Sequence, residues 1–331
     1  MRPKILIARA VFPDVIERLA ATFDVESNQE DRIYNAAELA EKIRDKDGLF
    51  ITGSERMSAE TIAAAPRLKA ICNMAVGYNN IDVDAATAAG VMVTNTPDVL
   101  NQTTADMAWA LLMAAARRIT ESEHWLRAGH WKKWTYDGLL GADIHGSTLG
   151  IIGMGRIGQA IARRSTGFDM QVIYHNRSRL TPEQEAHANN ARYVDKDELL
   201  KTADHVMLVL PYSAQSHHTI GAAELELMKP TAILVNIARG GIVDDAALIE
   251  ALRAHRIAGA GLDVFENEPA LNPAFLGLSN VVLTPHIGSA SEATRRAMAN
   301  CAAGNLVAAL SGALPPNLLN PTVDTTLRQG A

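Results

Sequence analysis

Cysteine is scarce in this sequence, which has only Cys72 and Cys301 among its 331 residues. Two cysteines cannot build the disulfide framework of a small secreted domain, and no metal-ligand cluster accompanies them. Long apolar runs are also missing, which argues against a membrane span. The first apolar run, Lys4–Ala8, is too short for the core of a signal peptide. We therefore expect a cytoplasmic protein with no membrane partner and no metal.

The sequence also lacks a long run of basic residues and any low-complexity stretch. Together with a formal net charge of −6, this argues against nucleic acid or an anionic membrane as the main partner. The residues that are present, 48% hydrophobic and 21% charged, are ordinary for a globular protein. A chain of 331 residues is long for a single core, so two domains are expected.

The most informative motif lies between Leu149 and Gly158. An apolar run leads into Gly153, Gly155 and Gly158, which have the spacing G-x-G-x-x-G, and a helical pattern follows. The first glycine permits a tight turn, the second lets a pyrophosphate approach the backbone, and the third lets helix and strand pack closely. The N–H groups at the start of the helix then face the phosphates. In this context the motif predicts a dinucleotide site.

Two parts of the chain alternate apolar runs with helical patterns, which is typical of parallel α/β sheets. In residues 1–98 the expected strands are Ile5–Ala8, Gly48–Ile51, Leu68–Cys72 and Val91–Thr94. From residue 148 six strands are expected, at Thr148–Ile152, Gln171–His175, His205–Leu210, Ala232–Ile237, Gly259–Asp263 and Val281–Thr284. A last helix is expected to follow the capping signature Ser289–Glu292 and to return to the first domain.

We therefore predict an α/β protein with two parallel-sheet domains, Rossmann-like or flavodoxin-like, and an active-site cleft between them. Residues 1–98 plus 288–331 would form the substrate-binding domain, and residues 99–287 the dinucleotide-binding domain. Residues 101–128 predict one long helix. The irregular segment after it carries Trp131, Trp134 and Tyr136, which would suit either a subunit contact or packing between the domains. We expect a homodimer.

The end of the second strand of the dinucleotide-binding domain indicates which cofactor binds. An NAD site usually has a carboxylate there for the ribose hydroxyls. Here the strand ends in Asn176, Arg177, Ser178 and Arg179, without a carboxylate. Arginine binds phosphate oxygens in bidentate fashion, so the pair would suit the 2′-phosphate of NADP(H). The alternative is a pair of solvent-exposed arginines. We predict that NADP(H) is preferred and that NAD(H) is possible.

Three polar residues follow strands whose carboxyl ends should meet at one edge of the same sheet. These residues are Arg239, Glu268 and His286. Taken singly, Arg239 could be a surface arginine, Glu268 a solvated acid and His286 a loop histidine. Together, at the edge where such sheets bind their ligands, they predict a catalytic site.

Five segments, spread over nearly the whole chain, resemble the D-isomer-specific 2-hydroxyacid dehydrogenase family, and within it the glyoxylate/hydroxypyruvate reductases. They are Ala75–Asp82, Gly150–Gly158, Val235–Gly241, Gly261–Pro269 and Thr284–Ser289. The resemblance implies that Arg239 binds the substrate carboxylate and polarises the ketone. It implies that His286 is the general acid, and that Glu268 hydrogen-bonds His286 and orients the ring.

The resemblance also assigns binding residues. The N–H groups of Val76 and Gly77 would hold the substrate carboxylate, although those residues alone read as an ordinary turn. Ser289 would lie beside the substrate, but helix capping would explain it as well. The expected cofactor contacts are Thr104, Gly153, Gly155, Arg156, Ile157, Gly158, Asn176, Arg177, Ser178, Arg179, Leu210, Pro211, Ile237 and Asp263.

We therefore expect an enzyme that reduces a small 2-keto acid, glyoxylate or hydroxypyruvate, to the D-2-hydroxy acid. Alternatives within the family are 2-ketogluconate, phosphoglycerate, other bulky 2-keto acids, and phosphite, whose enzymes carry lysine in place of Val76. An alternative of another class is a nucleotide-sensing corepressor. The sequence leaves open the physiological substrate, the preferred direction and the number of subunits.

Overall fold

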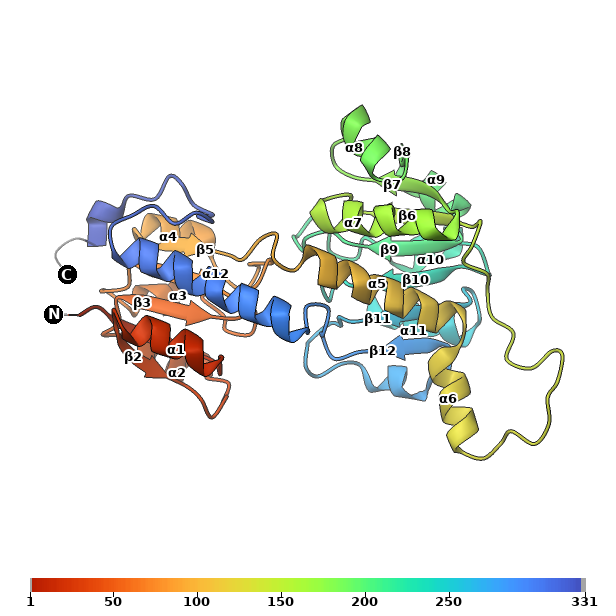
Figure 1. Cartoon of the computed structure of the whole chain (residues 1–331), viewed down its shortest axis with the longest axis horizontal. Helices are drawn as coiled ribbons and strands as arrows, with labels where there is room; N and C mark the ends of the chain where they lie inside the picture. Colours follow the sequence, from red (N-terminus) through yellow and green to blue (C-terminus); the bar gives the residue numbers. More distant parts are fainter. Residues whose placement is uncertain (1, 329–331) are drawn as a thin grey trace. The chain divides into compact units, whose positions relative to one another are not determined.

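The computed structural model describes residues 2–328, and Figure 1 shows the whole chain. The chain divides into two compact units. One contains the residues up to Leu100 together with those from Ser291 onward, and the other runs from Asn101 to Ala290. Each unit is built on a parallel sheet, so the expected class of two parallel-sheet α/β domains is confirmed.

The first unit has a five-stranded sheet in the order β2-β1-β3-β4-β5, which is the flavodoxin-like order. Its strands are β1 (Lys4–Ile7), β2 (Asp24–Ser27), β3 (Gly48–Ile51), β4 (Ala70–Asn73) and β5 (Met92–Thr94). Its helices are α1 (Pro13–Ala20), α2 (Ala36–Ile43), α3 (Ala59–Ala63), α4 (Val83–Ala88) and α12 (Glu292–Leu310). All neighbouring strands pair in parallel, so their carboxyl ends meet at one edge.

Helix α12 covers one face of this first sheet and contacts β3 and β4 (Figure 1). Small residues on its buried side, such as Ala299 and Ala302, pack with Ile5 and Phe50 of the strands. The helix begins after Ser291, whose hydroxyl accepts a hydrogen bond from the N–H of Thr294. The capping signature expected at Ser289 is therefore wrong by two residues, and capping does not account for Ser289.

The second unit has a seven-stranded parallel sheet in the order β12-β11-β10-β9-β6-β7-β8. Its strands are β6 (Thr148–Ile152), β7 (Gln171–His175), β8 (Arg192–Tyr193), β9 (His205–Leu208), β10 (Ile233–Asn236), β11 (Gly259–Leu262) and β12 (Val281–Leu283). Its helices are α5 (Asn101–Ala116), α6 (Ile119–Arg127), α7 (Arg156–Arg164), α8 (Pro182–His187), α9 (Lys196–Thr202), α10 (Ala222–Leu227) and α11 (Asp245–Arg253). Short 3₁₀ turns lie at Ser165–Phe168, Pro273–Gly277 and, in the first unit, Thr325–Arg328. Separate apolar clusters fill its two faces, around Leu234 on one and Ile151 on the other.

Two strands escaped the sequence-based prediction. Strand β2 is half-buried at an edge and reads Asp-Val-Glu-Ser, and β8 contains only Arg192 and Tyr193. Neither has the apolar run that marks a central strand, because an edge strand is covered less completely. The prediction of six strands in the second domain was therefore wrong by one.

The single helix expected over residues 101–128 is in fact two helices, α5 and α6. Arg118 takes a left-handed conformation, with φ of 51°, between them. The carbonyl of Ala116 accepts a hydrogen bond from the N–H of Ala142 instead of continuing the helix. The Arg118 side chain then binds Glu121 with two hydrogen bonds of 2.7 Å. Among residues 2–328, none of the helices combines the length and the apolarity that crossing a membrane requires.

Candidate active site

The glycine turn between β6 and α7 has the geometry that a dinucleotide needs. Gly153 has φ of 100°, and a Cβ on it would lie 2.7 Å from the carbonyl carbon of Val209. A Cβ on Gly158 would lie 2.4 Å from the carbonyl oxygen of Gly153, so strand and helix touch there. A Cβ on Gly155 would instead meet nothing within 4 Å. The open side of Gly155 thus fits the close approach of a pyrophosphate.

Helix α7 begins directly after that opening. Gly155 occupies its N-cap position, and no side chain caps the helix. Its first N–H groups and the positive end of its dipole are thus directed at the same place. Arg156 is exposed in the first turn, while Ile157 packs against the core. Leu210 lies next to the turn, because its N atom is 2.8 Å from the position of a Cβ on Gly153. These residues fit a phosphate-bearing cofactor.

The two arginines after β7 differ in their surroundings. Arg179 forms a bidentate pair with Glu185, with distances of 2.9 Å and 3.1 Å. Hydrogen bonds from Arg179 and Tyr174 lower the pKa of Glu185. Arg177 is exposed and forms no hydrogen bond or ion pair with any residue in the range 2–328. A 2′-phosphate would therefore find Arg177 available, whereas it would compete with Glu185 for Arg179.

Glu268 and His286 form the central contact of the site. His286 Nδ1 lies 2.6 Å from Glu268 Oε2, and Glu268 Oε1 accepts a 2.9 Å hydrogen bond from the N–H of Phe265. Burial opposes ionisation of Glu268, but hydrogen bonds from His286 and Phe265, with the charge of Arg239, lower its pKa overall. The carboxylate therefore stays charged beside the imidazole. The other ring nitrogen of His286, Nε2, has no hydrogen-bond partner among residues 2–328.

Arg239 follows β10, next in the sheet to the strand that leads to Glu268. Its Nη1 donates to the carbonyl of Ala238 at 2.9 Å, and its own carbonyl accepts from the side chain of Asn236. Burial lowers the pKa of the guanidinium, and the nearby charge of Glu268 opposes that shift. Because a guanidinium is never deprotonated under ordinary conditions, Arg239 supplies a fixed positive charge at the sheet edge.

Asp263 anchors the loop that carries His286. It is 1% exposed, and its carboxylate accepts hydrogen bonds from the Thr284 hydroxyl at 2.6 Å and from the N–H groups of Ile287 and Gly288. Its carbonyl also accepts from the N–H of His286 at 2.9 Å. Both carboxylate oxygens are thus used within the protein. The observed contacts make Asp263 a support for the histidine, and its expected contact with the cofactor stays a prediction.

In the first unit, the turn after β4 presents two free N–H groups. The carbonyl of Gly77 accepts from Asn73 at 3.0 Å, and the carbonyl of Val76 accepts from Asn95 at 2.9 Å. The N–H groups of Val76 and Gly77 donate to no group within residues 2–328. With the carbonyls held and the N–H groups free, this turn can bind an anion. The residues alone favoured an ordinary turn, and it was the family resemblance that assigned an anion to these two N–H groups.

The structure thus brings the predicted trio together within the second unit. Arg239, Glu268 and His286 follow β10, β11 and β12, which are neighbours in parallel register. Thr104, buried in the first turn of α5, lies near Gly288 of the histidine loop. Ile237 is buried just after β10, and Ser289 is half-buried and does not cap α12. Pro211 is exposed after β9, and no contact of its side chain tests its expected role.

Sequence reasoning missed the two asparagines that hold the anion-binding turn. Asn73 is fully buried at the end of β4, and Asn95 is 7% exposed just after β5. Both are polar residues at strand ends, so the signal that indicates Arg239 is present for them too. The first domain has no glycine motif, however, and without one a polar strand end does not by itself mark a site.

Comparison with known proteins agrees with this site. The family model described as "D-isomer specific 2-hydroxyacid dehydrogenase, NAD binding domain" matches residues 109–288. A glyoxylate reductase of Thermococcus onnurineus is 50% identical over 334 residues, covering 100% of this chain and 99% of the relative. A glyoxylate reductase of Pyrococcus furiosus is 48% identical, covering 98% of this chain and 97% of the relative.

Solved structures show the same likeness. A glyoxylate reductase from Paecilomyes thermophila superimposes with a TM-score of 0.86 at 35% identity, covering 96% of this chain and 98% of that one. The NADPH-dependent glyoxylate/hydroxypyruvate reductase of Sinorhizobium meliloti, in complex with NADP and malonate, gives 0.87 at 35% identity and covers 98% of both chains.

Fold, glycine turn and strand-end residues together define an oxidoreductase that binds a nicotinamide dinucleotide. The chain belongs to the D-isomer-specific 2-hydroxyacid dehydrogenase family, and its likeness to glyoxylate reductases extends over its full length. The family resemblance found in the sequence is thereby confirmed.

Proposed function

We propose that this enzyme reduces a small 2-keto acid, glyoxylate or hydroxypyruvate, to the D-2-hydroxy acid and that it prefers NADPH. The observation that carries the proposal is the 2.6 Å contact between His286 and Glu268, beside the fixed charge of Arg239. A keto acid offers a carboxylate for an arginine and a carbonyl oxygen for a proton donor. The names of the relatives and the NADP bound to the Sinorhizobium meliloti structure support the choice of substrate and cofactor.

The geometry supports the following roles for the side chains. A bound reduced nicotinamide supplies the hydride. Arg239 holds the carboxylate of the keto acid and polarises its carbonyl. Because Nδ1 of His286 is engaged by Glu268, Nε2 is the atom that gives the proton to the carbonyl oxygen. In the opposite direction, Nε2 removes the proton from the hydroxyl group. Glu268 fixes the ring and stays ionised, so it balances the positive charge of the imidazolium.

Further groups would bind the substrate and the cofactor. We assign the free N–H groups of Val76 and Gly77 to the substrate carboxylate, and Ser289 to the substrate side. The turn from Gly153 to Gly158 would hold the pyrophosphate, with Arg177 as the main contact of a 2′-phosphate. The remaining expected cofactor contacts are Thr104, Asn176, Ser178, Arg179, Leu210, Pro211, Ile237 and Asp263.

A substrate panel tests the proposal. Purified enzyme is mixed with NADPH or NADH and with glyoxylate, hydroxypyruvate, 2-ketogluconate or a bulky branched 2-keto acid, and loss of the reduced-nicotinamide absorbance is followed. We expect the highest kcat/KM with a small acid and NADPH, and a product of D configuration with hydroxypyruvate. A higher kcat/KM with 2-ketogluconate or the branched acid would overturn the substrate proposal. Equal or better constants with NADH would overturn the cofactor preference.

The same proposal includes the setting of the enzyme. Cys72 is buried and both cysteines are free thiols, which suits a reducing compartment, so we propose the cytoplasm. We also propose a homodimer, because large aromatic side chains in the second unit are exposed after α6.

A further inference from the structure

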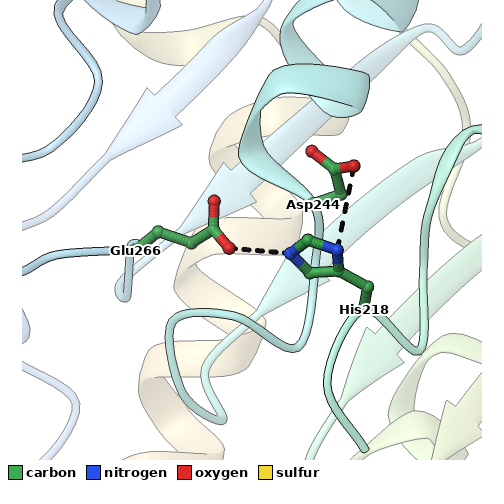
Figure 2. Close-up of side chains that lie close together, drawn as sticks. All are labelled: His218, Asp244 and Glu266. Atoms are coloured by element: carbon green, nitrogen blue, oxygen red, sulfur yellow. Dashed lines mark hydrogen bonds and ion pairs between the residues drawn. The ribbon is translucent and has the colours of Figure 1, made fainter.

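A second histidine, His218, lies where three loops of the second unit meet. Figure 2 shows its ring between Glu266 and Asp244. His218 Nε2 is 2.8 Å from Glu266 Oε1, and Nδ1 is 3.8 Å from Asp244 Oδ2. His218 belongs to the loop after β9, Asp244 caps α11, and Glu266 follows β11. None of these residues is in the proposed catalytic or binding sets.

Two of these loops carry catalytic residues. The backbone N–H of His218 donates to the carbonyl of Gly241 at 2.7 Å, two residues after Arg239. Its side chain contacts Glu266, two residues before Glu268. One histidine therefore touches both the loop that carries the arginine and the loop that orients the general acid.

The loop that carries Arg239 and the loop that carries Glu268 also contact each other directly. A Cβ on Gly240 would lie 1.7 Å from the carbonyl oxygen of Phe265, so only glycine permits this approach. The N–H of Phe265 in turn donates to Glu268, and the N–H of Glu266 donates to Asp245 at 3.0 Å. A shift of the Glu266 backbone would therefore reach the Glu268 carboxylate within two residues.

A metal ion does not explain this cluster well. The two carboxylates approach opposite nitrogens of the same imidazole ring (Figure 2). One ligand atom from each of the three side chains lies within 4.8 Å of the others, but Glu266 already contacts Nε2 at 2.8 Å while Asp244 lies 3.8 Å from Nδ1. A ring that bridges two acidic groups accounts for the arrangement without an ion.

We propose that His218 is a positioning residue. Its ring holds Glu266, and Glu266 in turn fixes the segment Phe265–Glu268 against the loop that carries Arg239. In that position Glu268 contacts His286. The proposal rests on the proposed function, because it assigns His218 to the geometry of that reaction. His218 itself touches neither substrate nor cofactor. The Asp244 carboxylate, at 3.8 Å, acts on the ring through its charge.

His218→Ala and His218→Gln test the proposal in the full-length enzyme. The alanine variant keeps the backbone bond to Gly241 and loses the contacts of the ring with Glu266, Asp244 and the stacked His217 ring. The glutamine variant retains an N–H donor for Glu266. His145→Ala is the matched control, because His145 is exposed at the amino end of β6, the opposite edge of the sheet. Turnover of glyoxylate by the wild-type enzyme is measured first. If the wild type does not reduce glyoxylate, the proposed function fails, and this is known before any variant is compared.

We expect His218→Ala to lower kcat roughly 10- to 100-fold, as small misplacements of catalytic groups do. KM for NADPH, the Kd of NADPH from fluorescence titration, and the melting temperature should stay close to those of His145→Ala. The deuterium isotope effect on kcat with deuterated NADPH should rise, because misalignment slows the chemical step. His218→Gln should restore most of kcat.

The partner residue supplies a second arm. Glu266→Ala should cause a similar loss, and the double variant His218→Ala/Glu266→Ala should be no slower than either single variant. A kcat of His218→Ala within about twofold of His145→Ala would overturn the proposal. So would independent, multiplying losses in the double variant, failure of glutamine to restore kcat, or a defect confined to NADPH binding.

Discussion

His286 is the residue at which chemistry and binding can be separated. Its Nε2 is the proton donor in the proposed reaction, and the residue follows β12, which three strands separate from β6 and the glycine turn that would hold the cofactor. We expect His286→Ala to lower kcat about 10²–10⁴-fold, the usual contribution of general acid–base catalysis. Fluorescence titration should show NADPH binding close to wild type.

His145→Ala again serves as the control, since it removes an exposed histidine from the same unit. A His286→Ala enzyme with undiminished kcat would eliminate the acid role. Loss of NADPH binding together with kcat would mean that the histidine supports the fold or the cofactor site.

From the sequence, Arg177 and Arg179 are equally good candidates for binding the 2′-phosphate, but their surroundings in the structure differ. Arg179 is already paired with Glu185 through Nε and Nη2, whereas Arg177 is exposed and unpaired among residues 2–328. If the 2′-phosphate is bound here, Arg177→Ala should raise KM for NADPH strongly and leave KM for NADH nearly unchanged. Arg179→Ala should have the smaller effect on NADPH.

Comparison of the two variants shows which arginine, if either, binds the 2′-phosphate. The measurement is the ratio of kcat/KM for NADPH to that for NADH in both variants and in wild type. An unchanged ratio in Arg177→Ala would show that the loop does not recognise the phosphate. A larger change in Arg179→Ala would show that the cofactor displaces Glu185.

Among the elements, the ends of central strands could be predicted from the sequence, whereas the edge strands and the break between two helices could not. Central strands such as β10 are continuous apolar runs, so their ends, and with them Arg239, could be placed from sequence. The edge strands β2 and β8 are short and half-exposed, so no pattern marked them. The break at Arg118 depends on a hydrogen bond between Ala142 and Ala116, which are far apart in the sequence. Contacts of that kind leave no local signal.

The same distinction applies to the candidate site. The residue types at the strand ends indicated the trio, because a carboxylate, an imidazole and a guanidinium each have a recognisable role in catalysis. The supports of those residues are long-range contacts: Asp263 with the His286 loop, and Asn73 and Asn95 with the turn at Val76. Their side chains are common at strand ends, and only the fold shows which atoms they hold.

The start of α11 provides an element-scale test that depends on pH. Burial raises the pKa of Asp245 to about 6, above its ordinary 3.8, and the charges of Glu266 and Asp244 add to the shift, although the N–H of Glu266 opposes it. The folded protein thus binds this proton more tightly than the unfolded chain. The stabilisation is complete below pH 3.8 and is lost as the pH rises through about 6. A shift of about two pKa units corresponds to about 3 kcal/mol.

Asp245→Asn keeps an oxygen for the N–H of Glu266 and removes the titration. We expect the variant to melt at a higher temperature than wild type at about pH 8, and at a similar temperature at about pH 4. Asp197→Asn, an exposed acid in the first turn of α9, is the control and should show no such difference. A variant less stable than wild type at the higher pH would show that the charged form of Asp245 is the stabilising one.

At the scale of the whole molecule, the segment between α6 and β6 is the feature that one chain leaves unexplained. It extends away from the sheet of its own unit (Figure 1). Trp131, Trp134 and Tyr136 are 60%, 78% and 82% exposed. Aromatic side chains exposed together are characteristic of an interface, where they contribute much of the binding energy. This favours the subunit contact over packing within one chain.

Trp134→Glu places a charge in that proposed interface. We expect wild type to sediment as a dimer and the variant to shift toward the monomer, because a buried unpaired charge is costly. Leu276→Glu is the matched control: Leu276 is 70% exposed in the 3₁₀ turn of the same unit, outside the segment. A monomeric wild type would refute the homodimer. A Trp134→Glu protein as dimeric as Leu276→Glu would place the interface on another surface, and the exposed aromatic segment would then need another partner.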